Sequence, residues 1–515
     1  MLFALLAAAD ARAQSVTTSP LQPSLTDPRH AQQFESDSAP EGLRAPEPER
    51  IAAPPRSGVG DTGFDSTGET AKSKNKKKQA RRKPGAPHPA PSRPPAPPGP
   101  PQRSGGRAAA PQFAVRATYA EAYRPPDAPQ RRSMPSNADA FEPLGLRLGS
   151  FVVRPSIDVT RGYNSNPAHS QNGSGSYFVT AESALQLRSD WSRHSYGADL
   201  RGSFTRYDTE RDLNQPQVDI KTFSRFDIAR DTRIDTESRF YLSTDYPGSP
   251  NLQAGIARLP IYYTYGSSVG LTRSFNRLEL TAKGSIDQFR YNDSQLTDGT
   301  TASNRDRDFD QYVGQLRASY QATPGVKPFV EIAADMRQHE LPIDRNNLRR
   351  DSRALTPKLG TTFELTRKLT GEIGVGYLMR RFEDATLPDM RGVIADASLV
   401  WTASALTTAT LSATSRAEES VLPGVSGALR RDAGLKVEHA FRRWLIGTVT
   451  LGYGLDQYVG SPREDTRTSL GAAITYKFNR DLWLKAEVRR DSLRSNEPGS
   501  DYDANVVMFG LKLQR

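Results

Sequence analysis

The 515-residue chain contains no cysteine, and it has little of the apolar content that a large buried core requires. Hydrophobic residues make up 36% of it, and the mean hydropathy is -0.63. Without cysteine the chain has neither a disulfide framework nor a thiolate metal site. No stretch reaches the roughly 18 to 20 consecutive apolar residues of a membrane helix. Any part of the chain that crosses a membrane must therefore do so as strands.

Catalytic and cofactor motifs are also missing. The sequence has no P-loop, no dinucleotide fingerprint and no G-x-S-x-G elbow. Its histidines are scattered without metal-ligand spacing, and they are His30, His88, His169, His194, His339 and His439. We therefore expect no cofactor, no metal site and no enzymatic activity. A hydrolase whose catalytic groups come together only in the fold stays open as an alternative.

The first residues, MLFALLAAADARA, combine a short apolar run with Ala11-Arg12-Ala13, the small-x-small pattern of signal peptidase cleavage. We predict a signal peptide over residues 1–13, cleaved before Gln14. Such a peptide usually begins with basic residues, and none stands here. We explain this by an internal start at Met1 and a longer leader.

Residues 14–147 are predicted to be a disordered arm. Residues 1–140 hold 23 of the 38 prolines, and KSKNKKKQARRK is followed directly by PGAPHPAPSRPPAPPGPP. The basic residues of that run are Lys72, Lys74, Lys76, Lys77, Lys78, Arg81, Arg82 and Lys83. Clustered like charge and low apolar content predict disorder. Because no recognition fold accompanies the run, we expect no nucleic acid as a partner.

From Leu148 to Arg515 apolar and polar residues alternate with period two, as in half-buried strands. In DLWLKAEVRRD (481–491) a Leu/Leu/Ala/Val face alternates with a Trp/Lys/Glu/Arg face. We expect eighteen such segments, which begin near residues 149, 177, 195, 217, 233, 261, 277, 309, 327, 353, 369, 391, 406, 430, 444, 466, 481 and 502. Short links such as FRRW alternate with long polar ones such as YNDSQLTDGTTASNRDRD.

Alternation is compatible with a soluble sandwich or propeller and with a membrane barrel. Three features favour the barrel: an even number of segments, the alternation of short and long links, and outward-phased aromatics near segment ends, such as Tyr377, Trp401 and Tyr453. No repeat with fixed internal motifs supports a propeller or solenoid. We predict an all-β, up-and-down antiparallel transmembrane barrel of about 18 strands over residues 148–515.

The polar face of each predicted strand would line the lumen. The candidates for this lining are Glu182, Arg188, Asp199, Arg201, Lys283, Asp287, Arg317, Glu331, Asp335, Arg337, Lys358, Glu364, Glu372, Arg380, Asp396, Lys436, Trp483, Lys485, Glu487, Arg489 and Lys512. Both charge signs are present, so we expect no strong selectivity for ions of one sign. We expect more than half of these charges to pair across strands. The inward-phased aromatics Trp483 and Phe329 could stack on sugars or pack beneath a loop.

The first of the eighteen segments runs into DVTRGYNSNP (158–167), and the last ends the chain as ANVVMFGLKLQR (504–515). In these features the chain resembles the putative beta-barrel porin 2 family of Gram-negative outer-membrane proteins. The resemblance implies an outer-membrane pore, linked in some members to export of cell-surface polysaccharide. The chain departs from such barrels at Gln514 and Arg515, where the insertion machinery usually reads a terminal aromatic.

The leading hypothesis is therefore a passive conduit in the outer membrane, for solutes or for export of a polysaccharide. Its expected partners are outer-membrane lipid, the barrel-insertion machinery and, through a periplasmic arm, peptidoglycan or polysaccharide-export components. The alternative is a closed structural barrel that the basic arm tethers to the cell wall or to a periplasmic partner. An outer-membrane hydrolase is the third hypothesis.

Overall fold

The structure, a computed structural model, describes residues 141–515 apart from residues 254 and 367. The predicted signal peptide and the basic run of the arm lie outside the described residues. Eighteen long strands form the wall: β2 (Phe151–Asn164), β3 (Ser176–Ser189), β4 (Ser195–Tyr207), β5 (Gln215–Asp227), β6 (Thr232–Thr244), β7 (Ile261–Phe275), β8 (Leu278–Tyr291), β11 (Phe309–Tyr320), β12 (Val326–His339), β13 (Ser352–Thr366), β14 (Leu369–Phe382), β15 (Met390–Ser404), β16 (Thr407–Glu418), β17 (Gly427–Arg442), β18 (Leu445–Val459), β19 (Glu464–Lys477), β20 (Leu482–Ser495) and β21 (Tyr502–Gln514).

Short elements accompany the wall in the described part of the chain. They are β1 (Leu146–Leu148), β9 (Ser294–Gln295), β10 (Thr301–Ala302) and the 3-10 turns η1 (Arg211–Leu213) and η2 (Arg305–Arg307). Among the described residues, no helix is long and apolar enough to cross a membrane.

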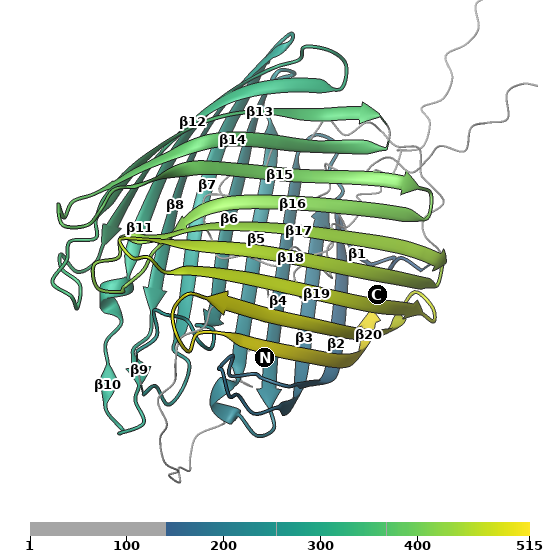
Figure 1. The fold of residues 1–515 in the computed structure, drawn as a ribbon. Helices are drawn as coiled ribbons and strands as arrows, with labels where there is room; N and C mark the ends of the chain where they lie inside the picture. Colours follow the sequence, from purple (N-terminus) through teal and green to yellow (C-terminus); the bar gives the residue numbers. More distant parts are fainter. Residues whose placement is uncertain (1–140, 254, 367) are drawn as a thin grey trace, which may run out of the picture. The chain divides into compact units, whose positions relative to one another are not determined.

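The long strands form one antiparallel sheet that closes into a barrel (Figure 1). Each pairs with the next in the chain, β8 pairs with β11, and β21 pairs with β2 from Ser156↔Gln514 to Asn164↔Val506. Closure removes the free edges that an open sheet would present to lipid. The predicted all-β antiparallel barrel of about 18 strands is confirmed. The largest error in a strand start is at β17, predicted from near residue 430 and observed from Gly427.

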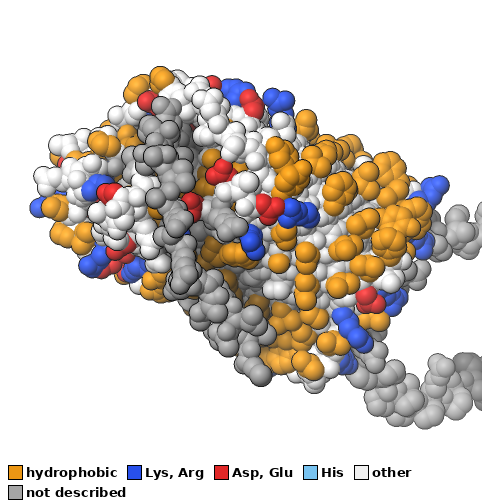
Figure 2. Space-filling model, turned by 90° about the horizontal axis from the view of Figure 1, so that it is seen from below, with side chains coloured by type: hydrophobic (Ala, Val, Ile, Leu, Met, Phe, Trp, Pro, Cys, Tyr) orange, Lys and Arg blue, Asp and Glu red, His pale blue; other side chains and the backbone are white. Residues whose placement is uncertain are grey.

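The two faces of the wall differ as the alternation predicts. Apolar side chains gather on the outer surface (Figure 2), where Val269, Leu359 and Phe509 are 56%, 63% and 60% exposed. On β20, Val488 is 52% exposed whereas the alternating Arg489 is buried. A wall with this polarity fits a hydrocarbon exterior and a polar interior.

The connections alternate in length around the barrel. Residues 276–277 and 443–444 are tight turns at one end, which we call the turn end. Residues 245–260 and 340–351 are long loops at the other end, which we call the loop end. Consecutive links of an up-and-down barrel must lie at opposite ends, so the asymmetry expected from the sequence is present in the structure.

At the loop end the hairpin of β16 and β17 separates from β15, whereas β17 stays paired with β18 as far as Gly427↔Val459. Pairing between β15 and β16 stops at Ala397↔Ala413, whereas β14 pairs with β15 as far as Met390. Pairing between β16 and β17 also continues, as far as Glu418↔Ala428. The two strands of this hairpin therefore stay together while they separate from β15.

The separated part of the hairpin, residues 414–431, lies against the inner face of the neighbouring wall, and we call it the inner hairpin. Its Ala417 and Leu429 are buried in one apolar cluster with Met390 and Ile394 of β15 and with side chains of β13 and β14. Strands β15 and β17 also contact each other directly. The inner hairpin thus occupies part of the barrel interior at the loop end.

Candidate functional site

The interior of the barrel is lined by ion pairs between neighbouring strands. Arg188 of β3 pairs with Asp199 of β4 at 2.7 Å, and Arg201 of β4 pairs with Glu182 of β3 at 3.2 Å. The register places Ala184 opposite Arg201 and Gln186 opposite Asp199, so these pairs are diagonal cross-strand contacts on one face. All four were predicted to face inward.

A larger network spans five strands, β11 to β15. Arg317 of β11 donates to Glu372 of β14 at 2.8 Å and lies 3.7 Å from Glu331 of β12. Lys358 of β13 lies 3.7 Å from Glu331 and pairs with Asp396 of β15. These side chains are largely shielded from solvent, where an unpaired charge would be costly. The network therefore stiffens the wall at this place.

Other predicted residues also meet partners inside. Arg380 and Asp335 pair at 2.6 Å, Asp287 and Arg239 at 2.7 Å, and Lys485 and Asp158 at 2.8 Å. The remaining contacts are Lys436 with Glu438 at 3.3 Å, and Arg489 with Asp491 at 2.9 Å and with Glu487 at 3.5 Å. Their role in conduction stays a prediction.

The inward-phased aromatic rings pack against cations. The Trp483 ring lies under Lys477 and Lys512, at 4.6 and 5.4 Å from its centroid. Arg317 lies 3.4 Å from the Phe329 centroid, and Phe329 is buried. These contacts stabilise the stacked cations by cation–π attraction. In this structure both rings therefore support charged side chains of the wall.

Two predicted residues stand apart from these pairs. Glu364 has the inward phase of β13 but is exposed close to the turn end. Lys283 lies half-buried on β8, two residues along the same face from Ser285.

A charged cluster at β16–β19 was missed in the sequence. It consists of Arg416, Glu418, Arg430, Asp432, Asp456 and Arg467. Arg467 lies 2.7 Å from Asp432 and 2.9 Å from Asp456. The strand phase could have identified part of it. Arg430 and Asp432 share the phase of Lys436, which was predicted to face inward.

The tip of the inner hairpin, residues 419–426, is held by β12 and by loops. Arg337 of β12 pairs with Glu419 and donates a second hydrogen bond to the Ala417 carbonyl at 3.1 Å. Asn251 of the 245–260 loop donates to the Glu419 carbonyl at 3.3 Å and accepts from the Val421 amide at 3.1 Å. The tip is therefore bound from two sides of the loop-end mouth.

The 340–351 loop holds the same tip. Asn346 donates to the Val421 carbonyl at 2.8 Å, and Arg350 donates to the Val425 carbonyl at 2.9 Å. Arg350 is itself fixed by Asp344 at 2.6 Å. These bonds hold the hairpin tip and two long loops together, and they narrow the loop-end mouth.

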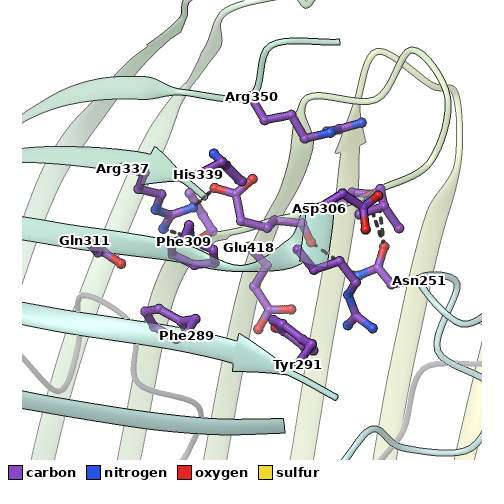
Figure 3. A pocket seen from close by; sticks show the side chains of 15 residues that line it. Asn251, Phe289, Tyr291, Asp306, Phe309, Gln311, Arg337, His339, Arg350 and Glu418 are labelled. Atoms are coloured by element: carbon purple, nitrogen blue, oxygen red, sulfur yellow. Dashed lines mark hydrogen bonds and ion pairs between the residues drawn. The ribbon is translucent and has the colours of Figure 1, made fainter. Parts of the chain in front are cut away.

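A pocket of about 630 Å³, which includes space open to solvent, lies beside the tip (Figure 3). The Phe289 and Phe309 rings stack within it at 4.3 Å, and His339 continues the row 5.4 Å from Phe309. The register explains this row, because Phe309 lies directly opposite both Phe289 and His339. Glu418 of the inner hairpin faces the same space. The pocket therefore combines flat rings with charged groups.

Two carboxyl groups at this mouth have shifted pKa values. Burial raises the pKa of Asp308, just before β11, to about 6. Burial alone would also raise the pKa of Glu419, but the positive charges of Arg337, His339 and Arg380 outweigh it and lower the pKa. Glu419 is therefore ionised at neutral pH and able to hold its ion pair with Arg337.

Within residues 141–515, apart from 254 and 367, no group of three or more His, Cys, Asp or Glu side chains is arranged to hold a metal ion. The site consists of ion pairs, aromatic rings and backbone contacts.

A family model described as "Putative beta-barrel porin 2" matches residues 139–515. Among curated proteins, none matches this chain. Solved structures with a similar fold include the outer membrane protein OpdK from Pseudomonas aeruginosa, at 14% identity and a TM-score of 0.38, covering 70% of this chain and 99% of that one.

Two further structures are similar at the same level. The ferric enterobactin receptor PfeA from Pseudomonas aeruginosa is 9% identical with a TM-score of 0.37, covering 70% of this chain and 80% of that one. A BenF-like porin from Pseudomonas fluorescens is 11% identical with a TM-score of 0.37, covering 70% and 99%.

Proposed function

The chain belongs to the putative beta-barrel porin 2 family and is a porin-like β-barrel of the Gram-negative outer membrane; from this premise we propose that it is a passive conduit for small polar and charged solutes. No catalytic step is part of this function. The arm would extend into the periplasm, where its basic run could meet peptidoglycan or other polyanions.

The observation that carries the proposal is the contrast between the two faces of the wall. The outer face is apolar, whereas the inner face carries paired charges of both signs, as in the Arg317, Glu331 and Lys358 network. Such a lining supports the passage of hydrated solutes better than of apolar ones. Because most of the described inward charges pair with a charge of opposite sign, the conduit should discriminate only weakly between cations and anions.

The loop-end mouth sets the size of the solute in this proposal. The hairpin tip bound to Arg337, Asn251 and Arg350 leaves less room than the full barrel would. Small solutes are therefore favoured while the tip stays bound.

The test is single-channel recording of the refolded full chain in a planar bilayer. We expect stable conductance steps, with a reversal potential close to zero in a potassium chloride gradient. A folded, heat-modifiable barrel that gives no steps would contradict the conduit and favour the closed structural barrel.

Export of a polysaccharide is a second candidate. It is favoured by the Phe289 and Phe309 rings in the loop-end pocket, because sugar faces stack on aromatic rings. In the same recordings, a soluble polysaccharide should then block the current, and Phe309→Ala should weaken the block. Block that is unchanged in this variant would contradict a role of these rings.

A further inference from the structure

The wall has a seam between β15 and β16 at the loop end. Strand pairing across it ends at Ala397↔Ala413, so residues 390–396 have a partner strand only on the β14 side. In the seam the Ser415 hydroxyl replaces the backbone partner of Ala395. It accepts a hydrogen bond from the Ala395 amide at 3.0 Å and donates one to the Ala395 carbonyl at 3.1 Å. Unpaired backbone facing hydrocarbon costs several kcal/mol per group. A seam of this length in a membrane barrel therefore calls for a functional explanation.

The interior beside the seam is apolar. Ala417 and Leu429 have the phase that faces lipid elsewhere on these strands, since Ala433 of the same face is exposed. Both are nevertheless buried, against Met390 and Ile394 of the inner face of β15. Withdrawal of the inner hairpin would thus uncover an apolar surface next to the seam.

The fit between hairpin and wall depends on a glycine. A Cβ atom at Gly392 would lie 2.6 Å from the end of the Leu429 side chain, so a larger residue there would force that side chain to shift and crowd the contact. The contact consists of buried apolar side chains and the Ser415–Ala395 hydrogen bonds, and strand pairing across the seam is absent beyond Ala397↔Ala413. The seam can therefore open at less cost than a paired ladder, while β17 stays paired with β18.

The outer surface beside the seam is basic at its loop end. Arg353 of β13 lies opposite Arg381 of β14, and Arg391 of β15 is the next on this face. All three are exposed, and one carboxylate, Asp389, meets two of them, Arg391 at 2.8 Å and Arg381 at 3.7 Å. Three cations with one anion leave a positive patch that suits an anionic headgroup.

Apolar side chains continue from this patch toward the middle of the wall. Tyr377 and Val393 lie opposite each other on the outer face and are 43% and 55% exposed. A cationic patch next to an apolar surface is complementary to an anionic lipid. The headgroup would bind the arginines, and the acyl chains would lie on the apolar side chains.

We propose that the seam between β15 and β16 is a lateral port for a phosphate-bearing lipid of the outer leaflet. Arg353, Arg381 and Arg391 receive the headgroup, and an acyl chain enters between β15 and the inner hairpin onto Met390 and Ile394. The proposal rests on the membrane barrel of the proposed function but not on ion conduction, so a barrel that fails to conduct leaves it intact.

The test places a benzophenone amino acid at Ile394, which faces the interior beside the seam. The refolded full chain is inserted into vesicles of equal parts phosphatidylcholine and phosphatidylglycerol and irradiated, and lipid adducts are identified by mass spectrometry. The matched control is Val313, an inward, buried residue of β11 whose strand is paired on both sides. We expect phosphatidylglycerol adducts at residue 394 at least several-fold above those at residue 313.

Two variants separate the parts of the proposal. Gly392→Val should displace the hairpin and increase the adducts at residue 394, whereas Arg381→Gln with Arg391→Gln should shift them from phosphatidylglycerol toward phosphatidylcholine.

Folding of each variant is checked by heat modifiability, and Leu378 of the same cluster serves as a second probe position if the Ile394 probe prevents folding. Equal adducts at residues 394 and 313, or crosslinks only within the protein, would overturn the port. Unchanged lipid preference in the double variant would overturn the headgroup site.

Discussion

The substitution Arg337→Ala should release the tip of the inner hairpin and widen the loop-end mouth. Arg337 is 3% exposed and holds the tip in two ways, through its ion pair with Glu419 and its hydrogen bond to the Ala417 carbonyl. Asn251, Asn346 and Arg350 still contact the tip after the change. We therefore expect a shift in the position of the tip and not the loss of the barrel.

The size of the effect follows from the burial of the pair. Removing one partner of a fully buried ion pair costs about 3 to 5 kcal/mol. Because the Glu419 side chain keeps 19% exposure, water can solvate part of its charge. We therefore expect Arg337→Ala to lower the free energy that holds the tip in its bound position by about 2 to 3 kcal/mol. Since about 1.4 kcal/mol corresponds to a tenfold change in an equilibrium constant, the ratio of released to bound tip should rise roughly 30- to 140-fold.

Single-channel recording of the full chain measures this directly. Arg337→Ala should spend more time at a higher conductance level than the unsubstituted protein. The control is Arg188→Ala, which removes the same charge from an inward ion pair with Asp199, far from the hairpin in the strand order. Equal changes in both variants would show that lost charge alone alters the current, and the proposed constriction by the tip would be refuted.

Three further predictions concern pH, the wall and the arm. Burial raises the pKa of Asp308 from 3.8 to about 6, so the stability that the protonated carboxyl contributes is full below pH 3.8 and is lost as the pH rises through about 6. The protection factors of amides in the neighbouring loop, which are exchange rates corrected for the intrinsic pH dependence, should therefore rise on acidification through this window, and Asp308→Asn should remove that rise. Arg317→Ala leaves Glu372 and Glu331 without their arginine inside the wall and should destabilise the barrel by about 3 to 5 kcal/mol. The loss should be measured as a lower temperature of heat modification. A variant as stable as the parent would contradict the structural role of the network. Deletion of residues 72–83 should abolish sedimentation of the full chain with peptidoglycan while membrane insertion is unchanged; undiminished sedimentation would contradict a tethering role for the basic run.

The sequence by itself determined the strands and their two faces. Alternation with period two is a local property that can be recognised in any ten residues. Every strand of a barrel that separates lipid from a polar interior shows this alternation. For this reason the eighteen segments were placed closely, and residues such as Arg188, Arg317 and Glu487 meet charged partners on the inner face.

Only the tertiary structure decided which residues meet across the interior. Arg337 and Glu419 are 82 residues apart, and their contact depends on a hairpin that separates from β15 beyond Ala413. Ala417 and Leu429 have the alternation of a lipid-facing pair and yet are buried inside. Local pattern cannot reveal this, because the contacts that hold the hairpin inward come from β12, β15 and the loops. The seam and the narrowed mouth are consequences of these long-range contacts.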